Sequence, residues 1–188
     1  MRIVVAISGA SGAVYGIRIL EVFKKLGVES HLIVTAAAAE TIPMETGRRV
    51  KDVERLAAKT YRIDDLAARV SSGSFQTDGM VVVPCSTKTL GGIANGYADN
   101  LLLRAADVTL KERRPLILVV RETPLTLIHL ENMATVTRAG AVVLPAMPAF
   151  YHRPKTIDDL VDHVVGKVLD AFRIQHNLYR RWNGLPSA

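Results

Sequence analysis

Cysteine, long apolar runs and aromatic residues are scarce in this sequence of 188 residues, and each shortage excludes a class of protein. The single cysteine, Cys85, excludes an internal disulfide framework and fits a reducing compartment. No apolar run approaches the roughly 20 residues of a membrane-spanning helix. The five apolar residues before Ser8 are too few for a secretory signal. We therefore expect a cytoplasmic protein with no membrane contact.

Sequence signals for metal, dinucleotide and nucleic-acid binding are missing as well. The five histidines show no metal-ligand spacing, so no metal is expected. Residues 7–16, "ISGASGAVYG", are rich in glycine but match neither the G-x-G-x-x-G fingerprint nor a P-loop. The net charge of +6 comes from cationic residues spread along the chain, and only 5% of residues are aromatic. This distribution disfavours nucleic acid as a partner.

The sequence does contain a regular alternation of short apolar runs with helical patterns. The runs are rich in Val, Ile and Leu, as in parallel strands covered on both faces; they span 2–7, 30–35, 79–84, 115–120 and 141–145. Helical spacing covers 11–26, 99–113, 126–138 and 156–172. We predict one domain over residues 1–188, of α/β class, with a doubly wound parallel sheet of the Rossmann or flavodoxin-like type and helices on both faces. Residues 36–78 are expected to form a helical insertion with a mobile loop near 71–75.

Small, hydroxyl and cationic residues follow the predicted strands. In an open parallel sheet the carboxyl ends of the strands meet at one edge, where ligands bind. The residues concerned are Gly9, Ala10, Ser11, Thr35, 84–89, Arg121, Glu122 and 145–154. Singly, each has a structural explanation: the serines as helix caps, Cys85 as an inert core residue, Arg121 as a surface ion pair. Together they predict a site for a ligand with a phosphate and a flat polar ring.

Three segments resemble one known family over most of the chain. They are "GASGAVYG" (9–16), the stretch 84–133 from "PCSTKTLGG" to "IHLENM", and "GAVVLPAMPAFYHRP" (140–154). All three closely resemble the flavin prenyltransferases, the UbiX-like family. The resemblance implies that a dimethylallyl group passes from dimethylallyl monophosphate to N5 and C6 of reduced FMN, without a metal. It also implies that the product, prenylated FMN, serves a separate UbiD-like aromatic acid decarboxylase.

The resemblance implies roles for individual residues too. The positions that match flavin contacts are Gly9, Ala10, Ser11, Thr35, Ser86, Thr87, Lys88, Thr89 and Arg121. The positions around the prenyl phosphate are Lys111, Arg121, Glu122, Tyr151, Lys167 and Trp182. The catalytic set is Ser11, Glu45, Lys111 and Glu122, with Ser11 and Glu45 moving protons near N5. The family also suggests a dodecamer with sites between subunits, in which the tail about 175–188 packs on a neighbour.

This sequence departs from the family in two places, and three other functions remain open. Lys167 stands where some members have arginine, and Val120 stands where proline is common. An FMN-dependent cysteine decarboxylase of the phosphopantothenoylcysteine type would carry "PxMNxxMW", whereas this chain has "PAMPAFYHRP". A non-enzymatic FMN carrier would leave Lys111 and Lys167 without a purpose. Direct decarboxylation of an aromatic acid is the third alternative, because fold likeness alone does not decide function.

Overall fold

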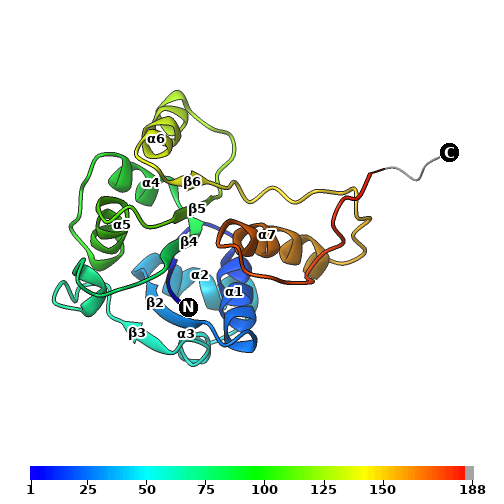
Figure 1. Cartoon of the computed structure of the whole chain (residues 1–188), viewed down its shortest axis with the longest axis horizontal. Coiled ribbons are helices and arrows are strands. Elements are labelled where there is room, and N and C mark those ends of the chain that lie inside the picture. The colour runs from blue at the N-terminus through cyan, green and yellow to red at the C-terminus, as the bar shows by residue number, and fades with distance from the viewer. Residues whose placement is uncertain (185–188) are drawn as a thin grey trace.

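A sheet of six parallel strands lies at the centre of the computed structural model, which describes residues 1–184 (Figure 1). The strands are β1 (Arg2–Ile7), β2 (Glu29–Val34), β3 (Lys59–Tyr61), β4 (Gly79–Cys85), β5 (Leu116–Val120) and β6 (Val142–Val143). Their order across the sheet is β3-β2-β1-β4-β5-β6. The chain adds strands on one side of β1 first and then on the other, so the order reverses between β1 and β4. Such a switch point leaves a crevice at the carboxyl ends of the strands.

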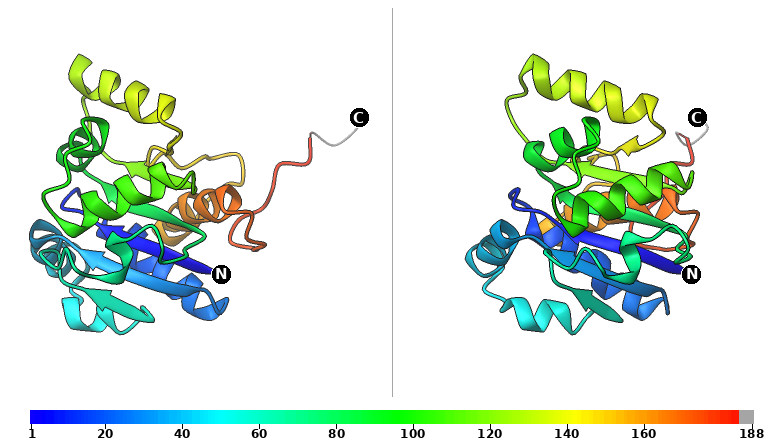
Figure 2. Two further views of the ribbon diagram at one scale, coloured as in Figure 1. Left: turned by 60° about the vertical axis from the view of Figure 1, so that its left-hand side comes forward. Right: turned by 90° about the vertical axis from the view of Figure 1, so that its left-hand side faces the viewer.

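Helices cover both faces of the sheet (Figures 1 and 2). On one face the core layer is completed by α1 (Ala13–Lys25), α2 (Ala36–Thr46), α3 (Val50–Glu54) and α7 (Ile157–Ala171). On the other face the core layer is completed by α4 (Thr87–Ala94), α5 (Leu101–Lys111) and α6 (Leu127–Arg138). In β1, Ile3 and Val5 lie in the first layer and Val4 and Ala6 in the second. Successive side chains of a strand point to opposite faces, so a strand buried on both sides must be apolar throughout.

The predicted α/β fold is confirmed, and the main difference lies in residues 36–78. The four predicted helices are present, with ends that differ from the prediction by at most two residues. The segment 36–78 holds α2, α3, β3 and a 3-10 turn, η1 (Arg69–Ser71). The apolar pattern does not predict β3, because this three-residue edge strand reads "KTY" and is not fully buried. Polar edge strands lack the apolar run that marks the interior ones.

The chain leaves the sheet after β6 and forms an arm, by which we mean residues 145–156 and 173–184. The first segment extends away from β6 before α7 begins, and the second follows α7 and runs out beside it (Figure 1). Residues 185–188, the end of the predicted tail, lie outside the described residues. Within residues 1–184, no helix is both long and apolar enough to cross a bilayer.

Candidate functional site

A cavity of about 700 Å³ lies at the carboxyl ends of β1, β2 and β4, beside the point where the strand order reverses. Five predicted flavin-binding residues line it, and they come from the loops after β1, β2 and β4 and from the first turn of α4: Gly9, Thr35, Ser86, Lys88 and Thr89. Ala10, Ser11, Thr87 and Arg121 lie at the same edge of the sheet but are not among the lining residues. Five of the nine residues that the family resemblance assigned to the flavin therefore line this cavity, which lies at the edge of the sheet where a ligand was predicted.

Hydroxyl side chains shape the cavity by capping the helices around it. Thr35 accepts the Ala38 N–H at 3.1 Å and caps α2, while Ser86 accepts the Thr89 N–H at 3.3 Å and caps α4. Ser8 joins the ends of β1 and β4, because its hydroxyl donates to the Pro84 carbonyl and accepts the Ser86 N–H, each at 2.8 Å. Two helix N-termini, with their free N–H groups and positive dipole ends, thus lie at the cavity.

Gly9 is required at the rim of the cavity by close packing. A Cβ atom at this position would lie 2.4 Å from the Cβ of Ala37, far inside van der Waals contact. The loop after β1 can therefore approach the start of α2 only if residue 9 has no side chain. Gly12 follows with a φ of 107°, in the left-handed region, where the chain turns into α1.

A second polar group lies at the start of α1, where Glu45 from the end of α2 reaches across. One carboxylate oxygen of Glu45, Oε2, accepts the N–H groups of Gly12 and Ala13, both at 2.9 Å. Burial raises the pKa of Glu45, but these two hydrogen bonds, the Ser11 hydroxyl and the charge of Arg121 outweigh it and lower the pKa overall. Glu45 is therefore ionised at neutral pH, and it caps α1 in place of the predicted Ser11.

Arg121 and Glu122 begin the loop that follows β5. The Arg121 N–H donates to the Cys85 carbonyl at 3.2 Å, which ties this loop to the end of β4. The Arg121 charge acts on Glu45 and also on Tyr15, where it opposes the burial that raises the tyrosine's pKa. The Glu122 carboxylate accepts the Thr123 N–H at 3.0 Å, and its side chain is exposed. Ser11 and Arg121 thus both act on the Glu45 carboxylate, one through its hydroxyl and the other through its charge.

The outer wall of the cavity comes from a segment that the sequence analysis did not assign to the site. Asn95, Tyr97, Asp99 and Asn100, in the link between α4 and α5, all line the cavity. Asn100 caps α5 by accepting the Leu103 N–H at 3.1 Å. The string "NGYADN" lies between two helices and is rich in Asn, Asp and Gly. Such a composition marks a polar loop, and it is the only signal by which the sequence points to this segment.

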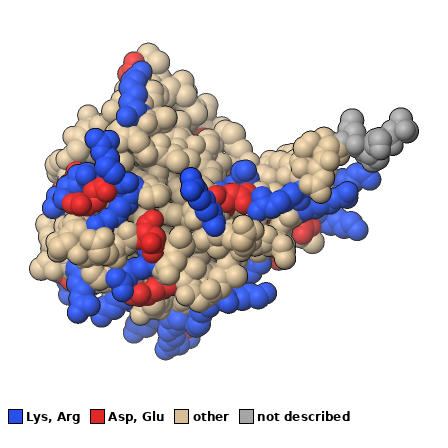
Figure 3. Space-filling model, viewed as in Figure 1, with Lys and Arg blue, Asp and Glu red and all other residues tan. Residues whose placement is uncertain are grey.

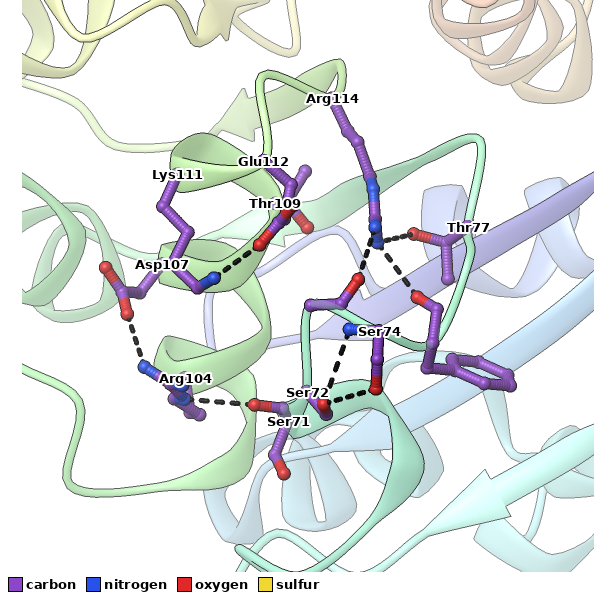
Figure 4. A network of polar contacts seen from close by, with 12 residues as sticks. Ser71, Ser72, Ser74, Thr77, Arg104, Asp107, Thr109, Lys111, Glu112 and Arg114 are labelled. Atoms are coloured by element: carbon purple, nitrogen blue, oxygen red, sulfur yellow. Dashed lines mark hydrogen bonds and ion pairs between the residues drawn. The ribbon is translucent and has the colours of Figure 1, made fainter.

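Lys111 lies at the opposite edge of the sheet from the cavity. Helix α5 starts at the cavity, where Leu102 and Leu103 line it, and ends at Lys111 just before β5 begins. At 1.5 Å per residue, the helix carries Lys111 roughly 12–14 Å from the cavity wall at Leu102 and Leu103. There Lys111 pairs with Glu112, close to the loop 71–77 that Arg104 and Arg114 hold by hydrogen bonds (Figure 4).

The remaining three substrate residues lie together on the arm and α7. The rings of Tyr151 and Trp182 are 5.8 Å apart, and the ring of Tyr151 is 6.1 Å from that of His163 on α7. Lys167 follows one turn later on that helix, with its side chain 51% exposed. We call Tyr151, His163, Lys167 and Trp182 the arm cluster. Figure 3 shows cationic side chains along the part of the molecule that projects from the main body. Within one chain, neither the arm cluster nor Lys111 reaches the cavity.

Neither Cys85 nor the aspartates of α7 form a reactive or metal-binding group. Burial raises the pKa of the Cys85 thiol to about 12, as expected for an inert core residue. Metal-free prenyl transfer predicts that the sequence lacks a D-D-x-x-D cluster for a metal-bound diphosphate, and this expectation is wrong for the string itself, because 158–162, "DDLVD", fits the pattern. Asp159, however, completes the capping box of α7, and Asp162 pairs with Arg18 at 2.6 Å. Among residues 1–184, no three His, Cys, Asp or Glu side chains gather as metal ligands.

The cavity suits a flavin mononucleotide by volume and by chemistry. Its volume of about 700 Å³ falls within the range of roughly 300–1,000 Å³ that small-molecule sites occupy. Apolar residues such as Ile63 and Leu102 offer flat contact for a ring, and Asn95 and Asn100 offer hydrogen bonds to it. The capped N-termini of α2 and α4, together with Lys88, suit a phosphate.

Fold and site together define a flavoprotein, and the family model described as Flavoprotein matches residues 1–169. A "Probable UbiX-like flavin prenyltransferase" from Streptomyces sp. (strain D7) is 54% identical over 100% of this chain and 94% of its own length. The chain thus belongs to the flavin prenyltransferase family, which confirms the resemblance read from the sequence.

Two solved structures support this membership. The structure of AnUbiX (PadA1) in complex with FMN and dimethylallyl pyrophosphate is 52% identical, with a TM-score of 0.97 over 98% of each chain. A dodecameric FMN-dependent UbiX-like decarboxylase from Escherichia coli O157:H7 is 51% identical, with a TM-score of 0.96 over 98% of this chain and 100% of that one. The peptidyl-cysteine decarboxylase EpiD, at 15% identity and a TM-score of 0.63, shares the fold alone.

Proposed function

We propose that this protein transfers the dimethylallyl group of dimethylallyl monophosphate to N5 and C6 of reduced FMN, producing prenylated FMN. The observation that carries the proposal is the cavity, where hydroxyl groups, Lys88 and two capped helix N-termini adjoin apolar walls. A ring with a phosphate tail suits such a site. AnUbiX (PadA1), at 52% identity, binds FMN and a dimethylallyl pyrophosphate in its crystal structure.

FMN, once bound, supplies the nucleophilic ring atoms, and the protein's residues hold and orient both reactants. In this proposal Gly9, Ala10, Thr35 and residues 86–89 bind the flavin. Departure of the donor phosphate builds negative charge, which Arg121, Lys111 and Lys167 stabilise. The rings of Tyr151 and Trp182 form the wall that keeps water from the allylic group, and the Tyr151 hydroxyl donates to the donor phosphate. Glu122 holds the donor from the loop after β5.

Ser11 and Glu45 move the proton that the second bond releases. The pKa of Glu45 is lowered and not raised, so its carboxylate is ionised at neutral pH, which is the charge state that a proton acceptor needs. Its hydrogen bonds to Gly12 and Ala13 hold the carboxylate in place beside Ser11. A fixed carboxylate acts as a general base without reorganisation, which supports this role.

Sharing of sites between subunits is part of the proposal. The cavity, Lys111 and the arm cluster lie in three separate places on one chain, so a complete site needs more than one copy. Large apolar side chains are exposed on α6 and the arm, including Leu127 and Ile128 at 68% and Phe150 at 69%. Surfaces of this kind favour association. A dodecamer is proposed, as in the Escherichia coli relative.

The wider setting follows from the same proposal. Residues 1–188 act as one flavoprotein domain whose tail packs on a neighbouring subunit. The product serves a UbiD-like aromatic acid decarboxylase. The protein works in the cytoplasm, since its single cysteine suits a reducing compartment.

Mass spectrometry of the flavin after anaerobic incubation with reduced FMN and dimethylallyl monophosphate tests the function. We expect the flavin mass to rise by one dimethylallyl unit, and we expect no change when the donor is omitted. A parallel incubation with dimethylallyl diphosphate identifies the preferred donor. Release of carbon dioxide from a hydroxybenzoate without a partner enzyme would instead support direct decarboxylation.

A further inference from the structure

Asp170, on the last turn of α7, gathers the donors of the chain segment that follows the helix. It accepts the Tyr179 hydroxyl at 2.6 Å and the Arg181 guanidinium at 2.6 Å, and His176 Nε2 lies 3.1 Å away. His176 Nδ1 accepts the Leu178 N–H at 3.2 Å, so Nε2 carries the proton and donates to Asp170. Three side chains within six residues of the arm therefore end on one carboxylate.

Gly166, one turn before Asp170, provides the surface on which this segment rests. A Cβ atom at position 166 would lie 2.5 Å from the Tyr179 ring and 2.8 Å from the His176 ring. Glycine weakens the interior of a helix, so its presence in α7 is explained by this contact. Gly166 and Asp170 together form what we call the seat, on which His176, Tyr179 and Arg181 are held.

The seat determines where Trp182 can lie. Arg181, which pairs with Asp170, is the residue immediately before Trp182, so the tryptophan backbone is one residue from an ion pair. The Tyr179 ring also packs 4.8 Å from that of His163, which belongs to the arm cluster. Trp182 meets Tyr151 edge to face, with ring centroids 5.8 Å apart and an angle of 79°.

We propose that Gly166 and Asp170 are positioning residues for Trp182, holding residues 176–181 on α7 so that Trp182 stands against Tyr151. This inference rests on the proposed function, because only that function assigns Trp182 and Tyr151 to the wall around the prenyl donor. A wall held in one place orients the allylic group and excludes water, whereas a loose wall does neither. The seat touches neither the donor nor the flavin. Asp170 also pairs with Lys167 at 3.7 Å, so changes at Gly166 and Tyr179, which leave that pair intact, separate the position of Trp182 from the charge of Lys167.

Trp182 is the only tryptophan in the sequence, so its fluorescence reports the seat directly. Three variants of the full-length, flavin-loaded protein, which we call the seat variants, alter the seat or the ring that rests on it: Asp170→Asn, Tyr179→Phe and Gly166→Ala. Alanine favours a helix over glycine, so Gly166→Ala displaces the Tyr179 ring without weakening α7. The control is Asp162→Asn, on the same helix, whose carboxylate pairs with Arg18 at 2.6 Å and not with the arm.

In each seat variant we expect the Trp182 anisotropy decay to gain a fast nanosecond component. We also expect kcat/KM for the prenyl donor to fall by about tenfold, with FMN affinity within about twofold of wild type. The Asp162→Asn control keeps the wild-type decay and kinetics. The seat is refuted if all three variants keep the wild-type decay, if the control changes equally, or if the decay changes while transfer does not. The anisotropy decay is recorded without the prenyl donor, so it tests the seat independently of the reaction. A wild-type protein that transfers no prenyl group would overturn the proposed function, and the decay alone would then decide whether the seat holds Trp182.

Discussion

The cavity and the arm cluster differ in how their residues are held. The cavity residues follow strands such as β1 and β4, whose side chains are almost completely buried, and its hydroxyls cap helices α2 and α4. The arm cluster stands outside the sheet, with Tyr151 44% and Trp182 59% exposed. A site on buried strands is preformed within one chain. An exposed cluster on an arm presents its groups to a neighbour, and its geometry depends on a few polar contacts.

The largest effect should come from Glu45→Gln, which tests the cavity side of this comparison. Glutamine retains an oxygen for the Gly12 and Ala13 N–H groups but cannot take up a proton as a carboxylate. We expect FMN affinity within a few-fold of wild type and product formation slowed by about 100-fold, or halted at a mono-alkylated flavin. Anaerobic single-turnover spectra measure this, with exposed Glu40→Gln on the same helix as control. Loss of FMN binding would reassign Glu45 to a structural role.

Mixing two impaired variants tests whether the arm serves a neighbour. Lys111→Ala and Tyr151→Phe should each lower kcat/KM for the donor by about 30-fold, because each removes a hydrogen bond to a charged phosphate. If Lys111 and Tyr151 of one site come from different subunits, assemblies unfolded and refolded together from both variants regain part of the wild-type rate. If the mixed assemblies are no more active than the separate variants, Lys111 and Tyr151 of one site come from the same subunit.

Gly9→Ala tests how rigid the cavity rim is. The new methyl group would lie 2.4 Å from Ala37 Cβ, so the loop after β1 or the start of α2 must shift. We expect a loss of about 2 kcal/mol in the free energy of unfolding and weaker FMN binding. Gly91→Ala is the matched control for stability, because its Cβ would meet only Asn132 at an ordinary 3.6 Å. Equal thermal stability of the two variants would show that the rim is not tightly packed.

The smallest expected effect concerns the acid stability of the arm. Burial by itself would raise the pKa of Asp170. The hydrogen bonds from Arg181, Tyr179 and His176 outweigh burial and lower the pKa from the usual 3.8 to about 2. A carboxylate with a depressed pKa stabilises the fold above pH 3.8, and the contribution is lost as the pH falls toward 2. The difference in melting temperature between wild type and Asp170→Asn should therefore be constant at neutral pH and shrink across that interval. A constant difference down to pH 2 would contradict the assignment.

Local composition was enough to predict the fold class and the edge where the ligand binds. Strands buried on both faces must be apolar throughout, and short polar loops must follow them, so "RIVVAI" and "GMVVVP" mark both the strands and the position of Gly9 and Ser86. The same logic fails for β3, whose polar edge position leaves no apolar run. It also fails for Asn95 to Asn100, which join the cavity wall only through the packing of α4 and α5.

The sequence by itself determined the α/β architecture, the family and the types of chemical group available, because these follow from patterns within a few residues. Only the tertiary structure decided which groups meet. Glu45 caps a helix that starts 32 residues earlier in the chain, Lys111 is carried to the far edge by the length of α5, and Asp170 gathers the donors that precede Trp182. Contacts of this kind depend on the path of the chain through space, which spacing along the sequence does not encode.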